Sequence, residues 1–245
     1  MRKFAIAALL TISSSFVFAD IDHSQLINRL GGGTGAILGA DLSQLETTPV
    51  ENTFGYGAQT ASNNVVADDF TVTGSTFQAT GISFFMYQTG ATAPSLTGVS
   101  WAIGAAPTTA LTLSAGSSTW WAPNGVGVYR VVSTSTVDAT RRIQQFDVTF
   151  GAPIDLVAGT YFLSWNASGT GASGPWQPHI PTSLNAYGQN GQQALANGAF
   201  APVTVDGVIG ADLPFIIRGA PVPEPATMLA LGVGAVALLR RRRKA

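Results

Sequence analysis

The sequence has no cysteine, few charged residues and almost no lysine. Without cysteine, a disulfide framework, a zinc finger, a redox pair and a thiol nucleophile are all excluded. Between Asp20 and Pro221, a region that we call the body, lysine is absent and five arginines face twelve carboxylates, which gives a net charge of −7. Such a surface lacks the cations that neutralise phosphates. We therefore expect neither nucleic acid nor anionic lipid as a partner of the body.

Motifs of nucleotide binding and of the common hydrolases are also missing. The glycine-rich stretch at 31–35 has no Lys-Ser/Thr after it and no strand before it, so it is predicted to be a flexible turn. The two histidines, His23 and His179, lie far apart in loop-like contexts, and neither His-Glu-x-x-His nor Gly-x-Ser-x-Gly occurs. The sequence therefore gives no signature of a metalloprotease or a serine hydrolase.

Carboxylates are the remaining candidates for chemistry. Those considered are Asp68, Asp69, Asp138, Asp147, Asp155, Asp206 and Asp212. Neighbouring residues of a strand point to opposite faces, so Asp68 and Asp69 share one site only if a bulge intervenes. The sequence favours solvated carboxylates. A calcium site at Asp68 and Asp69 and a catalytic pair in a polysaccharide hydrolase stay open as alternatives.

The hydrophobic pattern of the body is that of β-strands. Short runs rich in Val, Ile, Thr and aromatic residues alternate with Gly, Pro, Asn and Ser, and no long segment has the helical period. This pattern predicts an all-β fold, a single antiparallel β-sandwich or jelly-roll-like domain at 65–221. An irregular lead at 20–64 precedes it. Within the lead, "IDHSQLINRL" at 21–30 is predicted to form a short helix.

Two stretches predict which side chains share a face. In "GISFFMYQ", one face carries Ile82, Phe84 and Met86, and the other carries Phe85 and Tyr87. In "FDVTFGAPIDLVAGTYFLSW", turns are predicted at 151–153 and 158–159, followed by a strand in which Tyr161, Leu163 and Trp165 share a face.

Tryptophans in polar surroundings are the best candidates for recognition. The loop "WNASGTGASGPWQPHI" offers Trp176, Gln177 and His179, an indole for a sugar face with amide and imidazole groups for hydroxyls. The alternative is that this tryptophan, held between two prolines, plugs an open end of the domain. Trp120 and Trp121 form a second candidate, because neighbours in a strand cannot both point inward.

Both termini carry export features. Arg2 and Lys3 precede an apolar stretch that ends in Val17-Phe18-Ala19, which predicts a signal peptide at 1–19 removed by signal peptidase. At the other end, the uncharged run 226–239 reaches roughly 21 Å as a helix, short for a permanent span of a core roughly 30 Å thick. The basic residues Arg240, Arg241, Arg242, Arg243 and Lys244 follow it and belong on the cytoplasmic side. We expect a transient insertion into the inner membrane.

The C-terminal segment 222–245 resembles the PEP-CTERM sorting signal of Gram-negative bacteria. The residues that carry the resemblance are Pro223, Glu224 and Pro225, the apolar run and the Arg-rich end. The resemblance implies recognition and processing by the membrane protease exosortase. It also implies delivery to the cell surface or the extracellular matrix, commonly in bacteria that make exopolysaccharide. An ordinary C-terminal membrane anchor is the alternative.

Taken together, these features favour a non-enzymatic surface or matrix protein that is associated with exopolysaccharide, biofilm or floc. The alternative is an extracellular polysaccharide hydrolase that uses paired Asp residues. No cofactor is expected apart from the calcium considered above. A structure distinguishes the two functions, because a glycosidase needs two carboxylates about 5 to 10 Å apart across a cleft.

Overall fold

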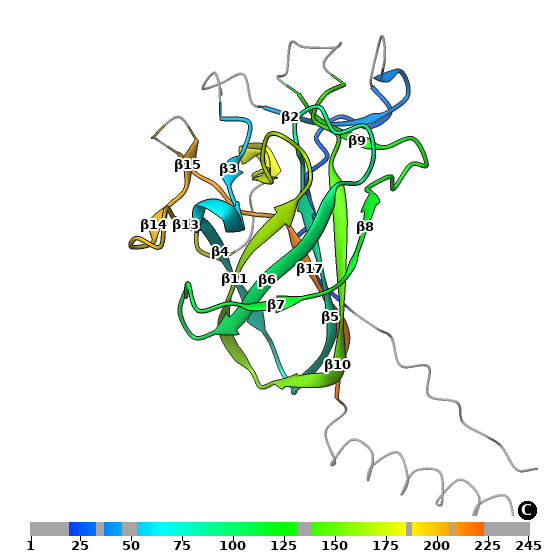
Figure 1. Cartoon of the computed structure of the whole chain (residues 1–245). Coiled ribbons are helices and arrows are strands. Elements are labelled where there is room, and N and C mark those ends of the chain that lie inside the picture. The colour runs from blue at the N-terminus through cyan, green and yellow to red at the C-terminus, as the bar shows by residue number, and fades with distance from the viewer. Residues whose placement is uncertain are drawn as a thin grey trace, which may run out of the picture.

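The computed structural model describes residues 20–32, 37–45, 53–131, 139–184, 188–205, 207 and 209–222 (Figure 1). In these residues the secondary structure is β, with single 3-10 turns at Thr60–Ser62 and Thr182–Leu184 and no α-helix. The all-β prediction is therefore confirmed, and the strands form antiparallel sheets.

Two sheets form the bulk of the body. The first has the strand order β1 (Ile21–Asp22), β17 (Phe215–Pro221), β5 (Phe77–Met86), β10 (Gln144–Leu156) and β8 (Ser117–Trp120). The second has the order β14 (Ala201–Pro202), β13 (Gln192–Ala194), β4 (Val65–Val72), β11 (Gly159–Gly169), β6 (Leu96–Gly104) and β7 (Thr112–Ser114). All pairs within these two sheets are antiparallel.

The remaining strands of the described residues form short pairs. They are β3 (Tyr56–Gly57) with β12 (Trp176–Gln177), β15 (Thr204–Val205) with β16 (Ile209–Gly210), and β2 (Asp41–Gln44) with β9 (Val128–Val131). The pair of β2 and β9 is parallel. In Figure 1, β2, β3 and β9 lie at the upper end of the body, whereas β5 and β10 reach its lower end.

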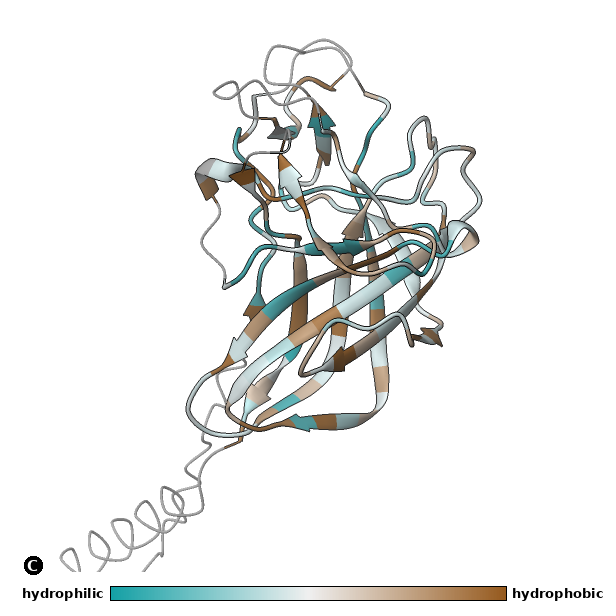
Figure 2. Ribbon diagram, turned by 90° about the vertical axis from the view of Figure 1, so that its left-hand side faces the viewer, coloured by the Kyte–Doolittle hydropathy of each residue, from teal (hydrophilic) through white to brown (hydrophobic). Residues whose placement is uncertain are grey.

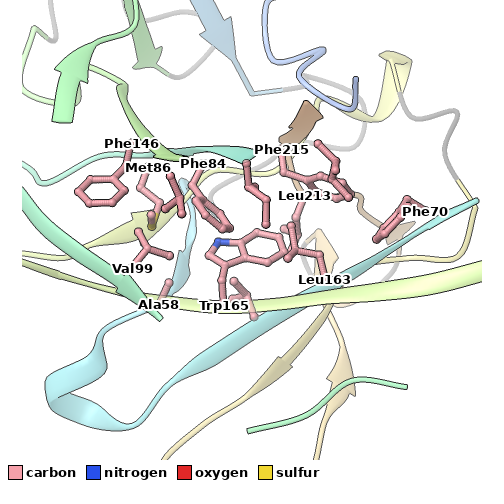
Figure 3. Packing of buried hydrophobic residues seen from close by; sticks show 14 of the residues in the cluster. Ala58, Phe70, Phe84, Met86, Val99, Phe146, Leu163, Trp165, Leu213 and Phe215 are labelled. Atoms are coloured by element: carbon pink, nitrogen blue, oxygen red, sulfur yellow. The ribbon is translucent and has the colours of Figure 1, made fainter. Parts of the chain in front are cut away.

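The main hydrophobic cluster joins the facing sides of the two sheets. Trp165 of β11 is completely buried, and its ring centroid lies 5.8 Å from that of Phe84 on β5 and 5.9 Å from that of Phe215 on β17. Figure 3 shows this indole surrounded by apolar side chains from both sheets. The alternation of apolar and polar residues that builds this face appears in Figure 2 as coloured bands along the long strands.

A second cluster lies on the outer face of the five-stranded sheet. Its buried members are Leu26, Phe85, Tyr87, Val128 and Ile143. The two-faced strand predicted at 82–87 is thus confirmed, since Ile82, Phe84 and Met86 belong to the main cluster and Phe85 and Tyr87 to the second. The predicted face of Tyr161, Leu163 and Trp165 also packs in the main cluster.

The predicted helix at 21–30 is wrong. Ile21 pairs with Ile217 in the sheet, and His23 exchanges two backbone hydrogen bonds with Phe215, so this backbone extends the sheet edge. Pairing with an exposed edge satisfies the backbone groups of a segment too short for a stable helix. The lead therefore contributes β1 to the first sheet and β2 to a pair with β9.

The predicted turn at 151–153 is also wrong. β10 runs without interruption from Gln144 to Leu156, and its register against β5 shifts between Thr149 and Ile154. Extra residues in one strand of a pair produce a bulge, which gives the same local signal of Gly and Pro as a turn. The turn at 158–159 is confirmed, because β10 ends at Leu156 and β11 begins at Gly159.

Candidate functional site

The loop that sequence analysis singled out turns its polar groups inward. Gln177 is completely buried, accepts a hydrogen bond from Trp165 Nε1 at 2.9 Å and donates one to the Pro178 carbonyl at 3.1 Å. Trp176 is half-buried against the second cluster, and its Nε1 donates to Ser173 Oγ at 3.1 Å. This arrangement favours the plug alternative over a sugar-binding loop, because Gln177 is not presented to solvent. The physical reason is that a buried indole N–H needs an acceptor, which Gln177 provides.

His179 is buried as well, beside a buried arginine. Arg130 of β9 is completely buried, and its Nη2 lies 2.9 Å from the Nε2 of His179. The same guanidinium donates from Nε to the Phe54 carbonyl at 3.0 Å and from Nη1 to Ser43 Oγ at 2.8 Å. These bonds join β2, β9 and the lead, so the imidazole belongs to the internal polar network and is not presented to a surface ligand.

Trp120 is the last residue of β8, Trp121 follows it, and their side chains contact different partners, as expected for neighbours in an extended chain. The indole of Trp121 packs on Phe85 with ring centroids 4.7 Å apart, at the edge of the second cluster. The ring of Trp120 lies under the Arg142 guanidinium, whose carbon is 4.6 Å from the ring centroid. Both indoles are half-buried, so each keeps part of its surface exposed.

Further along the outer face of the five-stranded sheet, beyond the apolar second cluster, lie polar side chains. Asp147 of β10 accepts hydrogen bonds from Ser83 Oγ at 2.6 Å and from Gln145 Nε2 at 2.9 Å. Its Oδ1 also lies 3.4 Å from Nη2 of Arg218 on β17, and these two side chains are 23% and 34% exposed. The Asp147 carboxylate therefore interacts with three donors from three neighbouring strands, β17, β5 and β10.

The network and the indole lie on the same face of the sheet, and the backbone N–H of Trp121 donates to the Ile143 carbonyl, four residues or about 13 Å along the chain from Asp147. Gln145 pairs with Phe85 on one side, on which Trp121 packs, and with Thr119 of β8 on the other. We call Trp121, Gln145, Asp147 and Arg218 the outer-face site. Sequence analysis identified Trp121 and Asp147 separately but missed Gln145 and Arg218. The alternation of Gln145 and Asp147 with buried residues was the available signal, whereas the pairing of β17 with β5 was not visible in the sequence.

Asp68 and Asp69 are not the solvated carboxylates that the sequence favours. Asp68 points into the body, is 1% exposed, and accepts the Leu213 N–H at 2.5 Å and the Asp69 N–H at 2.8 Å. Burial raises the pKa of Asp68 well above its usual value, and the nearby charge of Asp212 adds to the shift. Asp69 lies on the other face, accepts the Gln189 N–H at 2.6 Å, and its pKa is also raised by burial.

These hydrogen bonds argue against a calcium site at Asp68 and Asp69. The two carboxylates face opposite sides of β4, and each binds backbone N–H groups that a cation would have to replace. Across the part of the chain that the structure describes, no group of three or more His, Asp or Glu side chains is arranged to hold a metal ion.

The other carboxylates considered for catalysis are dispersed. Asp155 is exposed at the opposite end of β10 from Gln144 and accepts from Gln78 Nε2 at 3.1 Å. Asp212 is buried close to Asp68. Asp138 and Asp206 lie outside the described residues.

The C-terminal end of the body is fixed up to Val222. β17 pairs with β5 as far as Pro221 opposite Phe77, and the Val222 N–H donates to the Thr76 carbonyl at 2.7 Å. Residues 221–244, which begin where this strand ends, match the family model of the PEP-CTERM protein-sorting motif. The chain carries a PEP-CTERM sorting motif. No curated protein and no solved structure matches the chain.

The PEP-CTERM motif implies an exported protein that is sorted and processed by exosortase and delivered to the cell surface. The match includes Pro223, Glu224, Pro225 and the basic run from Arg240 to Lys244, which confirms the resemblance found in the sequence. These residues lie outside the described part of the structure, as does the predicted signal peptide at 1–19. Among the described residues, the structure contains no helix with the length and apolarity needed to cross a membrane.

Proposed function

We propose that the protein is a β-sandwich module of the cell surface or extracellular matrix of a Gram-negative bacterium, and that it binds exopolysaccharide without catalysis. The observation that carries the proposal is the outer-face site, located on a body that the sorting motif addresses to the cell surface. This site lies on the outer face of the five-stranded antiparallel sheet.

The chemistry of the outer-face site suits a sugar chain. An indole offers an apolar, polarisable surface to the C–H groups of a pyranose ring, and the neighbouring amide, carboxylate and guanidinium offer acceptors and donors for hydroxyls. Gln145, Asp147 and Arg218 already hold one another in place, so little side-chain entropy is lost when a ligand binds. Gln145, Asp147 and Arg218 lie on strands, which position side chains more rigidly than loops.

The arrangement of the carboxylates favours binding over hydrolysis. A glycosidase places one carboxyl as acid and a second as base or nucleophile across the scissile bond. Here Asp147 is engaged with Ser83, Gln145 and Arg218, and Asp68 is enclosed in the body. We therefore expect exopolysaccharide incubated with the protein to keep its chain length, as measured by size-exclusion chromatography.

Titration with exopolysaccharide from the host, followed by tryptophan fluorescence or calorimetry, tests the proposal. We expect saturable binding by the wild-type chain and an affinity about tenfold lower for Trp121→Ala, which corresponds to roughly 1.4 kcal/mol. The matched control is Trp120→Ala, a change at the neighbouring residue, the last of β8, for which we expect little change. Calcium is expected to have no effect on the affinity.

Thermal unfolding of each variant separates loss of the site from loss of the fold. Trp121 also packs on Phe85, so Trp121→Ala lowers stability, and the comparison is valid at temperatures at which both variants are folded. Equal affinities for wild type and Trp121→Ala would place the binding elsewhere. An absence of saturable binding by the wild type would reject the proposal.

A further inference from the structure

The two ends of the body, to which the signal peptide and the sorting motif are attached, lie close together. Asp20, the first residue after the predicted signal peptide, accepts the Gly219 N–H on its Oδ1 at 3.1 Å, and Ile21 pairs with Ile217 of β17. Gly219 is three residues before Val222, a distance of about 10 Å along a strand. Both ends therefore leave the body at the end where β17 stops, the lower end in Figure 1.

Two turns lie beside the end of β17. Register places Leu156 opposite Phe77 and Phe77 opposite Pro221, so the turn after β10 and the turn before β5 lie beside the end of β17. We call this surface the tail end of the body, and it comprises Asp20, the turn 73–76, Val157, Ala158 and Val222. Val157 is 62% exposed and Val222 is 39% exposed.

Only a few residues separate the tail end from the apolar run of the sorting motif. Val222 is hydrogen-bonded to Thr76, and the apolar run starts at Ala226, four residues further along. Four residues span at most about 14 Å when fully extended. One α-helix with its side chains is about 10–12 Å across, so the space between the folded body and the start of the apolar run can accommodate about one helix of a protease at most. A protease that binds the Pro-Glu-Pro segment inside such a gap must contact the folded body.

The chemistry of the tail end indicates a protein as the partner. Its carboxylates, Asp20 and nearby Asp155, are exposed, and the body contains no lysine. Anionic lipid headgroups attract basic surfaces and repel such an acidic one. Exposed Val157 and Val222 add apolar area that a protein surface can cover.

We propose that the tail end of the body is a docking surface for exosortase, which contacts Val157 and its neighbours while it processes the motif. This inference rests on the sorting motif and on the ends of β1, β10 and β17. It is independent of exopolysaccharide binding, so either proposal can fail without the other.

Single cysteines provide the test, because the natural chain has none. The full-length chain with Val157→Cys, labelled with a photoreactive maleimide in cells that contain exosortase, is expected to form a crosslink to the enzyme. The matched control is Leu38→Cys, a 75% exposed aliphatic residue in the turn before β2, a strand at the opposite, upper end of the body in Figure 1. We expect at least a tenfold lower crosslink yield from this position.

A spacer variant makes the test independent of the label. Insertion of six Gly and Ser residues between Val222 and Pro223 is expected to abolish the Val157→Cys crosslink while the tail is still removed. The amount of released, folded protein shows whether each variant folds. Equal crosslink yields from the two cysteines, or a crosslink that persists with the spacer, would overturn the docking proposal. Processing without any crosslink from Val157→Cys would overturn it as well.

Discussion

Trp165→Ala is expected to lower the free energy of unfolding by about 3–5 kcal/mol, because Trp165 is the largest completely buried side chain of the main cluster. The loss has two physical sources. Removal of the indole leaves a cavity between Phe84 and Phe215, and it leaves buried Gln177 Oε1 without the N–H that it accepts. Urea denaturation followed by circular dichroism measures the change.

Trp101→Ala is the matched control. Trp101 is directly opposite Trp165 on the neighbouring strand β6, but it is half-buried and packs on Phe150 with ring centroids 4.9 Å apart. Its Nε1 donates to Ser114 Oγ near the surface, where water can replace the bond. We expect a loss of about 1–2 kcal/mol. Equal losses for the two variants would show that Trp165 is not the centre of the core.

The pH dependence of stability is expected to show two opposing contributions. Burial lowers the pKa of His23 from 6.5 to about 4, although the charge of Asp22 partly opposes the shift. As the pH falls below 6.5, His23 is protonated in the unfolded chain but stays neutral in the folded protein. The free energy of unfolding is therefore highest above pH 6.5 and decreases toward pH 4. The full effect is about 3 kcal/mol. His23→Phe keeps a ring against Phe215 and is expected to remove this loss.

Asp68 acts on stability in the opposite direction. Its pKa is raised, so the folded protein keeps the proton after the unfolded chain has released it, and stability is lost as pH rises through the raised value. Asp68→Asn removes the titrating group, although its amide can accept only one of the two backbone N–H groups that Asp68 accepts. Whatever stability this costs at all pH values, the acid-side loss is expected to become steeper by up to about 1.4 kcal/mol per pH unit. Urea midpoints between pH 4 and 7 test both variants. Slopes identical to the wild type would contradict the assignment of these two groups.

Alternation of side chains predicted the long central strands, because burial of one face fixes a period of two. The strands around Phe84 and Trp165 were located in this way, and their faces were assigned correctly. The same rule explains why Trp120 and Trp121 diverge. It gives no information about which strands become neighbours, so the pairing of β1 with β17, which joins the two ends of the body, was not predictable.

Polar residues were harder to place from sequence. Gln177 and His179 lie in a Gly, Ser and Pro environment that is typical of exposed loops, yet their partners are Trp165 and Arg130, which are distant in sequence. Asp68 has the pattern of a strand surface but accepts the N–H of Leu213, 145 residues away. Buried polar groups are specified by such long-range partners, and a single sequence does not show them.

The sorting motif is the part of the account on which localisation depends, and the mass of the mature protein tests it most directly. The protein should be isolated from the surface or the medium of its own host and measured intact by mass spectrometry. We expect a chain that begins at Asp20 and lacks Arg240 to Lys244, which shows removal of both terminal segments. An extracellular protein with its C-terminal basic run intact would contradict processing by exosortase.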